Sequence, residues 1–248
     1  MSEAHPGLCI ADRYQLVLER IEIAAAKVGR IASEIRLAVV TKGQPIDRID
    51  AVIDAGARIL GENYFEEAVS KILRLERRAN LEWHMIGHVQ SRKAAGVVEH
   101  FNLVHSVDSV RLAQKLAQFA QVRDKQLPVY LQFNMSSEQS KYGFPAWDEA
   151  EWKNLLPGLR NILELGILDV KGLMTLPPYF DEPENARVYF RQLRKLRDYF
   201  RENLTRGMFT ELSMGMSGDF EVAIEEGATI VRIGTAIMGE RDQPVVQV

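Results

Sequence analysis

Short apolar runs alternate with stretches of helical period along most of the chain. In each run apolar and often β-branched side chains follow one another, and in the segment after it apolar residues recur three or four positions apart. The first pattern predicts a buried β-strand and the second an amphipathic helix. The runs occupy residues 37–40, 58–60, 82–87, 103–108, 129–134, 170–174, 209–214 and 229–235.

Most of the segments that follow these runs predict helices with one apolar face. The predicted helices run from Pro45 to Gly56, from the second strand to about Arg78, over 110–120, over 147–156, along a stripe of Tyr189, Leu193, Leu196 and Phe200, and from Asp219 to Gly227. An additional helix, from roughly Asp12 to Val28, precedes the first strand.

This order of elements predicts an α/β fold. Eight strands that alternate with helices within 248 residues match the size and order of a TIM-type (β/α)₈ barrel. An open, doubly wound sheet shows the same alternation, but a count of eight favours closure. We expect a single domain over residues 1–248, with an N-terminal extension and helix over 1–36 and the barrel over 37–239.

Composition narrows the class of partners. With 31 basic and 34 acidic residues the formal net charge is −3, so no bulk positive field attracts nucleic acid or an anionic membrane. The single cysteine, Cys9, excludes an internal disulfide and suits a reducing compartment. No signal peptide and no segment long enough to span a bilayer is evident. We expect a cytoplasmic protein that binds neither nucleic acid nor membranes.

In a barrel of this kind, functional groups gather at the carboxyl ends of the strands and in the loops that follow. That rule alone selects Lys42, Asn63, His84, Asn134, Met174, Ser217, Arg232, Gly234 and Thr235.

Lys42 is the most informative of these positions because it follows the apolar run 37–40 almost directly. If its amine lies inside the barrel mouth, desolvation and neighbouring cations lower its pKa and make it nucleophilic toward an aldehyde. The alternative is a lysine that extends from a strand end to solvent. Position alone leaves both interpretations open.

Two glycine-containing loops near the end of the chain predict a phosphate site. Residues 213–218 lead into a predicted helix, whose first N–H groups favour an anion, and Gly234-Thr235 adds a close backbone approach and a hydroxyl. Loops after the seventh and eighth strands commonly bind phosphate in TIM barrels. Two ordinary turns are the alternative, since glycine punctuates most loops.

Arg232 lies within the last apolar run, where a buried cation needs an anionic or acceptor partner. A bound cofactor ring is one candidate, and an ion pair with Glu211 is the other. A metal site is not expected, because the five histidines form no zinc-binding pair on one helical face and no cysteine pair exists.

Successive motifs of the chain resemble one known family over residues 37–239. They are Leu37-Ala38-Val39-Val40-Thr41-Lys42, Gly61-Glu62-Asn63, Trp83 through Gly87 with Gln90, His105 through Ser109, Gln132 through Asn134, Glu138 with Lys141 and Gly143, Gly172 through Thr175, Leu212 through Ser217, and Val231 through Gly239. The family is the pyridoxal phosphate homeostasis proteins, which are related to the N-terminal barrel of alanine racemases.

The resemblance implies a fold type III barrel that binds pyridoxal 5′-phosphate (PLP). Lys42 is similar to the lysine that holds the cofactor as a Schiff base, and Ser217, Gly234 and Thr235 resemble the phosphate cradle. Arg232 resembles an arginine that faces the pyridine nitrogen, which keeps that nitrogen unprotonated and weakens the ring as an electron sink.

The remaining positions match less closely. Asn63 and Met174 resemble positions at the mouth of the family's site. The chain departs from the family at Val89, at Arg92 and near Gln44, where leucine, asparagine and a second lysine are frequent. These departures leave the anchor intact and affect the rim of the site.

The function that the resemblance implies is a non-catalytic PLP-binding protein of intracellular PLP homeostasis, with indirect effects on amino-acid and keto-acid balance. A small PLP-dependent racemase or decarboxylase is the alternative. Alanine racemases add a β-domain that closes the site, whereas only residues 240–248 follow the last predicted unit here, so we expect a carrier and a monomer. A class I aldolase is a third option, but its Schiff-base lysine commonly lies on a later strand.

Overall fold

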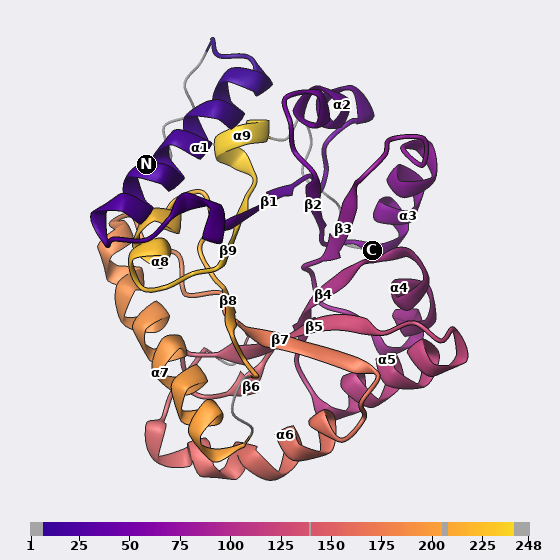
Figure 1. Cartoon of the computed structure of the whole chain (residues 1–248), viewed down its shortest axis with the longest axis vertical. Coiled ribbons are helices and arrows are strands. Elements are labelled where there is room, and N and C mark those ends of the chain that lie inside the picture. Colours follow the sequence, from indigo (N-terminus) through magenta and orange to yellow (C-terminus); the bar gives the residue numbers. More distant parts are fainter. Residues whose placement is uncertain (1–6, 139, 205–207, 241–248) are drawn as a thin grey trace.

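The computed structural model describes residues 7–138, 140–204 and 208–240, and its centre is a closed ring of parallel strands (Figure 1). The ring contains β1 (Arg36–Val40), β2 (Ile59–Glu62), β3 (Glu82–Met85), β4 (Leu103–Val107), β5 (Leu127–Asn134), β7 (Leu168–Met174), β8 (Glu211–Ser213) and β9 (Ile230–Ile233). Its order is β4, β3, β2, β1, β9, β8, β7, β5, and β5 pairs with β4 to close it. The predicted (β/α)₈ barrel is confirmed, and the open sheet is excluded.

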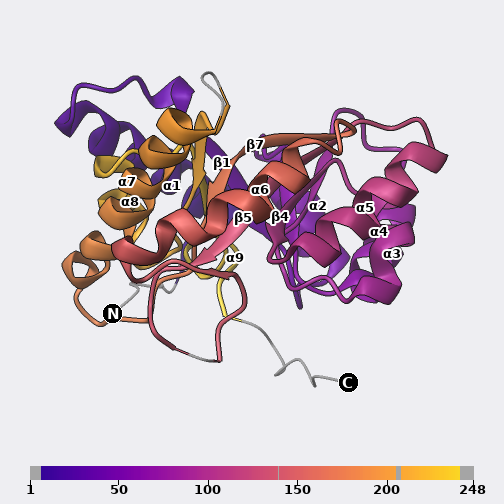
Figure 2. The ribbon, with the colours of Figure 1, turned by 90° about the horizontal axis from the view of Figure 1, so that it is seen from below.

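The helices lie outside the ring. They are α1 (Ile10–Lys27), α2 (Ile46–Asp54), α3 (Phe65–Arg74), α4 (Ala94–His100), α5 (Val110–Val122), α6 (Leu156–Leu163), α7 (Arg187–Asn203), α8 (Phe220–Glu225) and α9 (Thr235–Met238). Figure 2 shows α3, α4 and α5 on one side of the strands and α1, α7 and α8 on the other. Among the described residues, no helix combines the length and the apolar character needed to cross a bilayer.

Two helical segments differ from the prediction. The helix predicted over 147–156 is a 3₁₀ helix at Glu149–Leu155 that continues into α6, with Pro157 in the first turn of α6, where a missing N–H costs nothing. Helix α4 was not predicted because it is short and contains Gly96. A Cβ at Gly96 would lie 2.3 Å from the Phe65 ring, so glycine permits close packing there.

The inner and outer faces of the strands carry different residues. Val39 points outward into the large apolar layer beneath the helices, whereas Ala38 points into the barrel. Ala38 meets a small interior group there, which consists of Leu103, Tyr130, Met174 and Ile230. Buried polar side chains of His84, His105, Ser213 and Arg232 share the same interior. The barrel core is therefore partly polar.

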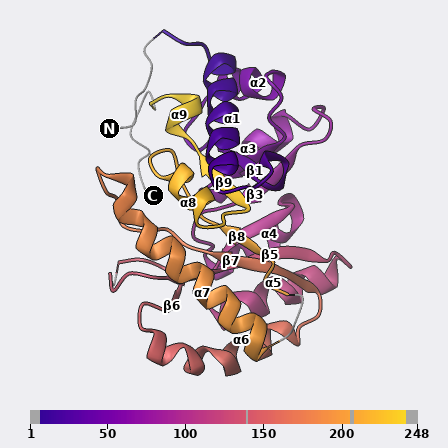
Figure 3. The ribbon, with the colours of Figure 1, turned by 60° about the vertical axis from the view of Figure 1, so that its left-hand side comes forward.

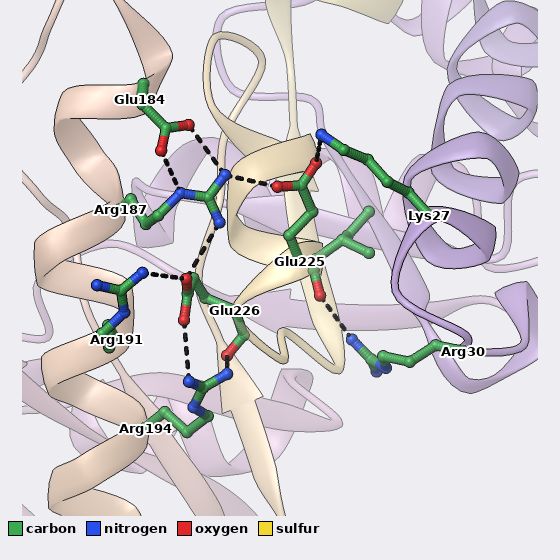
Figure 4. Close-up of polar contacts among 9 residues, drawn as sticks. Lys27, Arg30, Glu184, Arg187, Arg191, Arg194, Glu225 and Glu226 are labelled. Atoms are coloured by element: carbon green, nitrogen blue, oxygen red, sulfur yellow. Dashed lines mark hydrogen bonds and ion pairs between the residues drawn. The ribbon is translucent and has the colours of Figure 1, made fainter.

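The extra N-terminal helix closes one side of the barrel. The predicted helix is confirmed as α1, which packs against α8 and α9 (Figure 3). An ion-pair network joins α1, α7 and α8 at this side (Figure 4). Glu225 pairs with Lys27 and Arg187 at 2.5 Å each, and the buried Glu226 accepts hydrogen bonds from Arg187 and Arg191 at 3.1 Å each.

These arginines stabilise the ionised form of the Glu226 carboxylate. Burial acts to raise the pKa of Glu226, but the hydrogen bonds from Arg187 and Arg191 and the nearby charge of Arg194 outweigh burial and leave the pKa below its ordinary value of 4.5. A carboxylate with a lowered pKa in the folded state stabilises the fold above its ordinary pKa. That contribution is lost as the pH falls through the lowered pKa.

The variant Glu226→Gln removes the charge while keeping the side-chain volume. We expect the free energy of unfolding at pH 7 to fall by about 1–3 kcal/mol, because charge-assisted hydrogen bonds are lost. Urea unfolding at pH 7 and pH 4 measures the effect, and the difference from the wild type should shrink at the lower pH. Glu22→Gln on the exposed face of α1 is the control, and an equal loss in both variants contradicts the assignment.

Candidate functional site

A cavity of about 1000 Å³ opens at the carboxyl ends of the strands. Six of the seven residues predicted to bind a cofactor line it, and they are Lys42, Asn63, Ser217, Arg232, Gly234 and Thr235. The seventh, Met174, is fully buried in the barrel interior. It approaches the cavity through Leu176, which packs on the same interior group and also lines the cavity.

Strand pairing explains why residues so far apart in sequence meet here. β1 and β9 are parallel neighbours in which Val39 pairs with Ile233, so the chain leaves both strands at the same end of the barrel. Lys42 and Gly234 therefore emerge side by side. A Cβ at Gly234 would lie 3.3 Å from the Val40 Cβ, so glycine allows this turn to approach β1 closely.

The two late loops are joined by Ser217. Its Oγ accepts hydrogen bonds from the backbone N–H groups of Gly234 and Ala236, both at 3.3 Å. Asp219 precedes α8 as predicted, but its carboxylate accepts the Met216 N–H at 2.6 Å and so closes the loop instead of capping the helix. The Ser217 hydroxyl and the turn of Gly234 and Thr235 therefore lie together at the cavity wall, and a hydroxyl group can donate to an anion.

Lys42 follows β1 in a tight turn and is half-buried. The peptide groups on either side of it are held by charged side chains. The carbonyl of Thr41 accepts from Lys71 Nζ at 2.7 Å, and the N–H of Gly43 donates to Glu67 Oε1 at 2.6 Å. The turn is therefore fixed in place, and Lys42 lines the cavity instead of the outer surface.

The cluster behind this turn is buried and ionic. Lys71 Nζ donates to Glu62 Oε1 at 2.8 Å, and Thr41 Oγ1 donates to the same oxygen at 2.6 Å. Glu62 is fully buried, and burial raises its pKa, while the charge and hydrogen bond of Lys71 oppose that rise. Because an unpaired charge in this position is costly, Glu62 requires Lys71, which also donates to Glu67 Oε1 at 2.5 Å.

Arg232 is buried and is bound by neutral groups. Its guanidinium donates to Ser213 Oγ and, at 3.0 Å, to the carbonyl of Thr175. Glu211, the alternative partner considered from sequence, instead accepts hydrogen bonds from Arg36 and Tyr130. Burial lowers the pKa of Arg232 to about 10, and the negative charge of Asp219 opposes that shift. The guanidinium is thus a buried cation at the cavity wall.

Asn63, which directly follows β2, supplies an acceptor at the cavity wall. A Cβ at Gly87 would lie 2.3 Å from the Asn63 carbonyl oxygen, so only glycine allows the two segments to pack this closely. Asn63 Oδ1 is buried, and no hydrogen-bond donor among the described residues reaches it. Such an atom calls for a donor from a bound molecule.

Two residues selected by the strand-end rule lie elsewhere. His84 is fully buried inside the barrel, where it contacts His105 at 3.0 Å. Asn134 donates to the carbonyl of Glu138 at 2.9 Å and accepts from the N–H of Ser136 at 3.0 Å. Asn134 therefore orders the loop after β5, and neither residue is among those that line the cavity.

Sequence reasoning missed the cluster of Glu62 and Lys71. A signal was present, because Lys71 occupies the buried face of α3 together with Ala68. A charged residue at a core position of a helix requires a buried partner. The sequence does not identify that partner, because the pairing depends on how α3 packs on the strands.

Comparison with known proteins gives three similarities. A sequence profile of the family described as alanine racemase, N-terminal domain, matches residues 18–242. The pyridoxal phosphate homeostasis protein of Aquifex aeolicus is 40% identical over 230 residues, which are 93% of this chain and 97% of that protein. PipY of Synechococcus elongatus, solved with PLP bound, matches with a TM-score of 0.76 at 32% identity over 90% of this chain and 100% of PipY.

A more distant similarity concerns the fold alone. An alanine racemase of Clostridium difficile matches with a TM-score of 0.66 at 15% identity. The match covers 95% of this chain and 59% of the racemase. The shared part is therefore a barrel of the same architecture within a longer protein.

The buried pair behind Lys42 predicts a non-additive effect on stability. Lys71→Met leaves Glu62 buried without its cation, and we expect the free energy of unfolding to fall by about 3–5 kcal/mol at neutral pH. The loss should be smaller at acid pH, because the pKa of Glu62 then rises further and protonation relieves the unpaired charge. In Glu62→Gln/Lys71→Met both charges are absent, and the double variant should lose less than the sum of the single variants.

Urea unfolding of the wild type, Lys71→Met, Glu62→Gln and the double variant at pH 5 and pH 8 measures the coupling between Glu62 and Lys71. Lys195→Met is the control, since Lys195 lies on α7 with a side chain that is 59% exposed and pairs with Glu149 at 3.4 Å. Removal of such a surface pair costs about 0–1 kcal/mol. The buried-pair account is wrong if Lys71→Met is as stable as Lys195→Met.

Proposed function

This chain belongs to the family of the alanine racemase N-terminal domain, and within it to the pyridoxal phosphate homeostasis proteins, and from that premise we propose that it binds PLP. Its function would be to hold the cofactor for intracellular PLP homeostasis, with indirect effects on amino-acid and keto-acid balance. One observation carries the proposal. Lys42 and the late-loop residues Ser217, Gly234 and Thr235 line a single cavity.

The chemistry of the cavity wall fits PLP group by group. Lys42 Nζ would hold the cofactor covalently as a Schiff base with its aldehyde, a condensation that forms one C=N bond and releases one water. The hydroxyl of Ser217 and the Gly234-Thr235 turn supply donors for the phosphate. Arg232 supplies a donor for the pyridine nitrogen. Asn63 Oδ1, which is buried without a donor among the described residues, accepts from the ring hydroxyl.

Met174 has a different place in this proposal. It is buried among Ala38, Tyr130 and Ile230, and Leu176, which packs on that group, lines the cavity. A contact of Met174 with the cofactor would therefore be indirect. Its proposed role is to support the floor of the site from within the barrel.

We propose that the bound cofactor is held without turnover. An arginine at the pyridine nitrogen stabilises the unprotonated ring, which is then a weak electron sink for carbanion chemistry. Proton transfer on a substrate also requires a positioned second base. Tyr179 lines the cavity, but the residue is 79% exposed, so burial does not fix the position of its hydroxyl. The arrangement thus favours a carrier over a racemase or decarboxylase.

The proposed carrier acts as a cytoplasmic monomer. Lys42, Ser217, Arg232 and the Gly234-Thr235 turn, which the proposal uses, line one cavity of the chain itself. Cys9 is an exposed free thiol, which suits a reducing compartment.

The covalent anchor is tested by absorption spectroscopy. Wild-type protein incubated with PLP should show a visible or near-ultraviolet band from the Schiff base, and Lys42→Ala should lose that band. Lys27→Ala is the matched control, because Lys27 lines the same cavity but pairs with Glu225 at 2.5 Å, and it should keep the band. A band that survives in Lys42→Ala, or that is absent from wild type, overturns the proposal.

The phosphate cradle is tested by titration with PLP. Ser217→Ala should weaken PLP binding by about 1.5–3 kcal/mol, because one charge-assisted hydrogen bond to the phosphate is lost. Ser33→Ala, an exposed position outside the cavity, should bind PLP as tightly as wild type. Equal affinity of the Ser217 variant and wild type would remove Ser217 from the cradle.

The enzyme alternative has its own test. PLP-loaded protein incubated with each common amino acid should leave optical rotation and amino-acid content unchanged over many equivalents. Sustained racemisation or decarboxylation that depends on Lys42 would contradict the carrier.

A further inference from the structure

A line of buried polar groups crosses the barrel from the cavity to the amino end of β3. Arg232 donates to Ser213 Oγ, and Ser213 Oγ lies 2.8 Å from His105 Nδ1. His105 Nε2 lies 3.0 Å from His84 Nδ1, and His84 Nε2 lies 3.3 Å from Glu82 Oε2. Each of the first four side chains is buried, whereas the side chain of Glu82 is 54% exposed.

The two ends of this line fix the direction of every hydrogen bond between them. A carboxylate only accepts, so His84 Nε2 carries the proton and His84 Nδ1 is an acceptor. His105 Nε2 must then donate to it, which leaves His105 Nδ1 as an acceptor for the Ser213 hydroxyl. The Ser213 oxygen then accepts a hydrogen bond from Arg232, because a guanidinium can only donate. All four bonds point from Arg232 to Glu82.

This assignment requires both histidines to be neutral, and their surroundings favour that state. Burial lowers the pKa of His84, and burial lowers the pKa of His105 well below its ordinary value, with His84 and two arginines acting in the same direction. A protonated His105 would make the Ser213 oxygen accept from two cations, because that oxygen already accepts from Arg232.

A neighbouring cluster of Tyr130, Arg36 and Glu211 lies beside the line but does not supply its terminal acceptor. The Tyr130 ring packs on the His105 ring, with 4.7 Å between centroids. The Tyr130 hydroxyl, however, donates to Glu211, and Arg36 donates to both of these groups. The described contacts of Tyr130, Arg36 and Glu211 are thus satisfied among themselves, and they leave Glu82 as the terminal acceptor of the line.

Ser213, the member of the line that contacts Arg232, helps to fix the orientation of the Arg232 guanidinium at the cavity wall. One terminal nitrogen of the guanidinium is held by Ser213, and the other donates to the Thr175 carbonyl at 3.0 Å. Two anchors define the plane of a rigid guanidinium, and its remaining N–H groups are available to the cavity that Arg232 lines. Ser213 can accept from Arg232 in this geometry because its own proton is taken by His105.

We propose that Ser213, His105 and His84 form a one-way hydrogen-bond chain, ended by Glu82, that positions Arg232 as the donor to the pyridine nitrogen of bound cofactor. The histidines are positioning residues that act through Arg232, because neither is among the residues lining the cavity. The part that concerns the cofactor rests on the proposed function, whereas the direction of the chain is a property of the protein alone.

The direction is tested by NMR on full-length protein labelled with ¹⁵N at histidine, without added PLP. Imidazole nitrogen shifts distinguish a protonated from an unprotonated ring nitrogen. We expect both His84 and His105 to be neutral with the proton on Nε2. Either histidine with its proton on Nδ1, or positively charged at pH 7, overturns the chain.

The terminus is tested by Glu82→Gln, a change at a half-exposed side chain that leaves the apolar core intact. An amide can donate as well as accept, so the substituted side chain would no longer impose one direction on the hydrogen bonds of the line. We therefore expect a second set of NMR signals from His84 and His105. PLP binding should weaken about two- to tenfold, as expected for the loss of one hydrogen bond's contribution, with a shift in the visible band. Asp169→Asn is the control, because Asp169 also lies near the amino end of a strand but pairs with Lys171 at 2.5 Å, and it should change neither readout.

The two proposals fail in different ways. Wild-type protein with both Nε2–H histidines but no affinity for PLP would reject the function and support the chain. Wild-type protein that binds PLP with an Nδ1–H histidine would reject the chain and leave the function standing. Unchanged histidine signals and an unchanged band in Glu82→Gln would remove Glu82 as the terminus and overturn the chain as proposed.

Discussion

The parallel pairing of the first and last barrel strands is the constraint on which the site depends. In the register of β1 and β9, Val39 lies beside Ile233, so Lys42 leaves the barrel at the same end as the turn of Gly234 and Thr235. A closed ring of consecutive strands makes this neighbourhood obligatory, whereas the open doubly wound sheet, with the strand order 3-2-1-4-5-6, separates its first strand from its last. Closure of the barrel thus brings the Lys42 side chain and the turn of Gly234 and Thr235 to one cavity.

Two buried cations beside this site, Lys71 and Arg232, are stabilised in different ways. Behind Lys42, opposite charges meet directly, since Lys71 bonds both Glu62 and the backbone of Thr41. At Arg232 the cation is instead surrounded by neutral acceptors, Ser213 and the Thr175 carbonyl. The first arrangement fixes a backbone turn, and the second leaves a cation at the cavity wall without a carboxylate bonded to it. A cation held in this way is suited to face a ring nitrogen.

The order of strands and helices was predictable because it depends on local period, and the strand-end rule then located Lys42, Asn63, Ser217, Arg232 and the Gly234 turn. Buried polar partners were not predictable. His105 and Ser213 are separated by 108 positions, and only the closed barrel brings them within 2.8 Å. His84 illustrates the limit of the rule, because its side chain points into the barrel before the strand ends. The helix after residue 147 was misplaced because its first turns are 3₁₀.

Chemical trapping tests the central claim, that Lys42 and the late loops hold the same molecule, most directly. Borohydride reduces a Schiff base to a stable secondary amine, so treatment of the PLP-loaded protein followed by proteolysis and mass spectrometry identifies the lysine that carries the cofactor. The account predicts the modification on Lys42, with loss of labelling when inorganic phosphate competes for the Ser217 cradle. Labelling confined to other lysines, such as Lys27, which also lines this cavity, would contradict it.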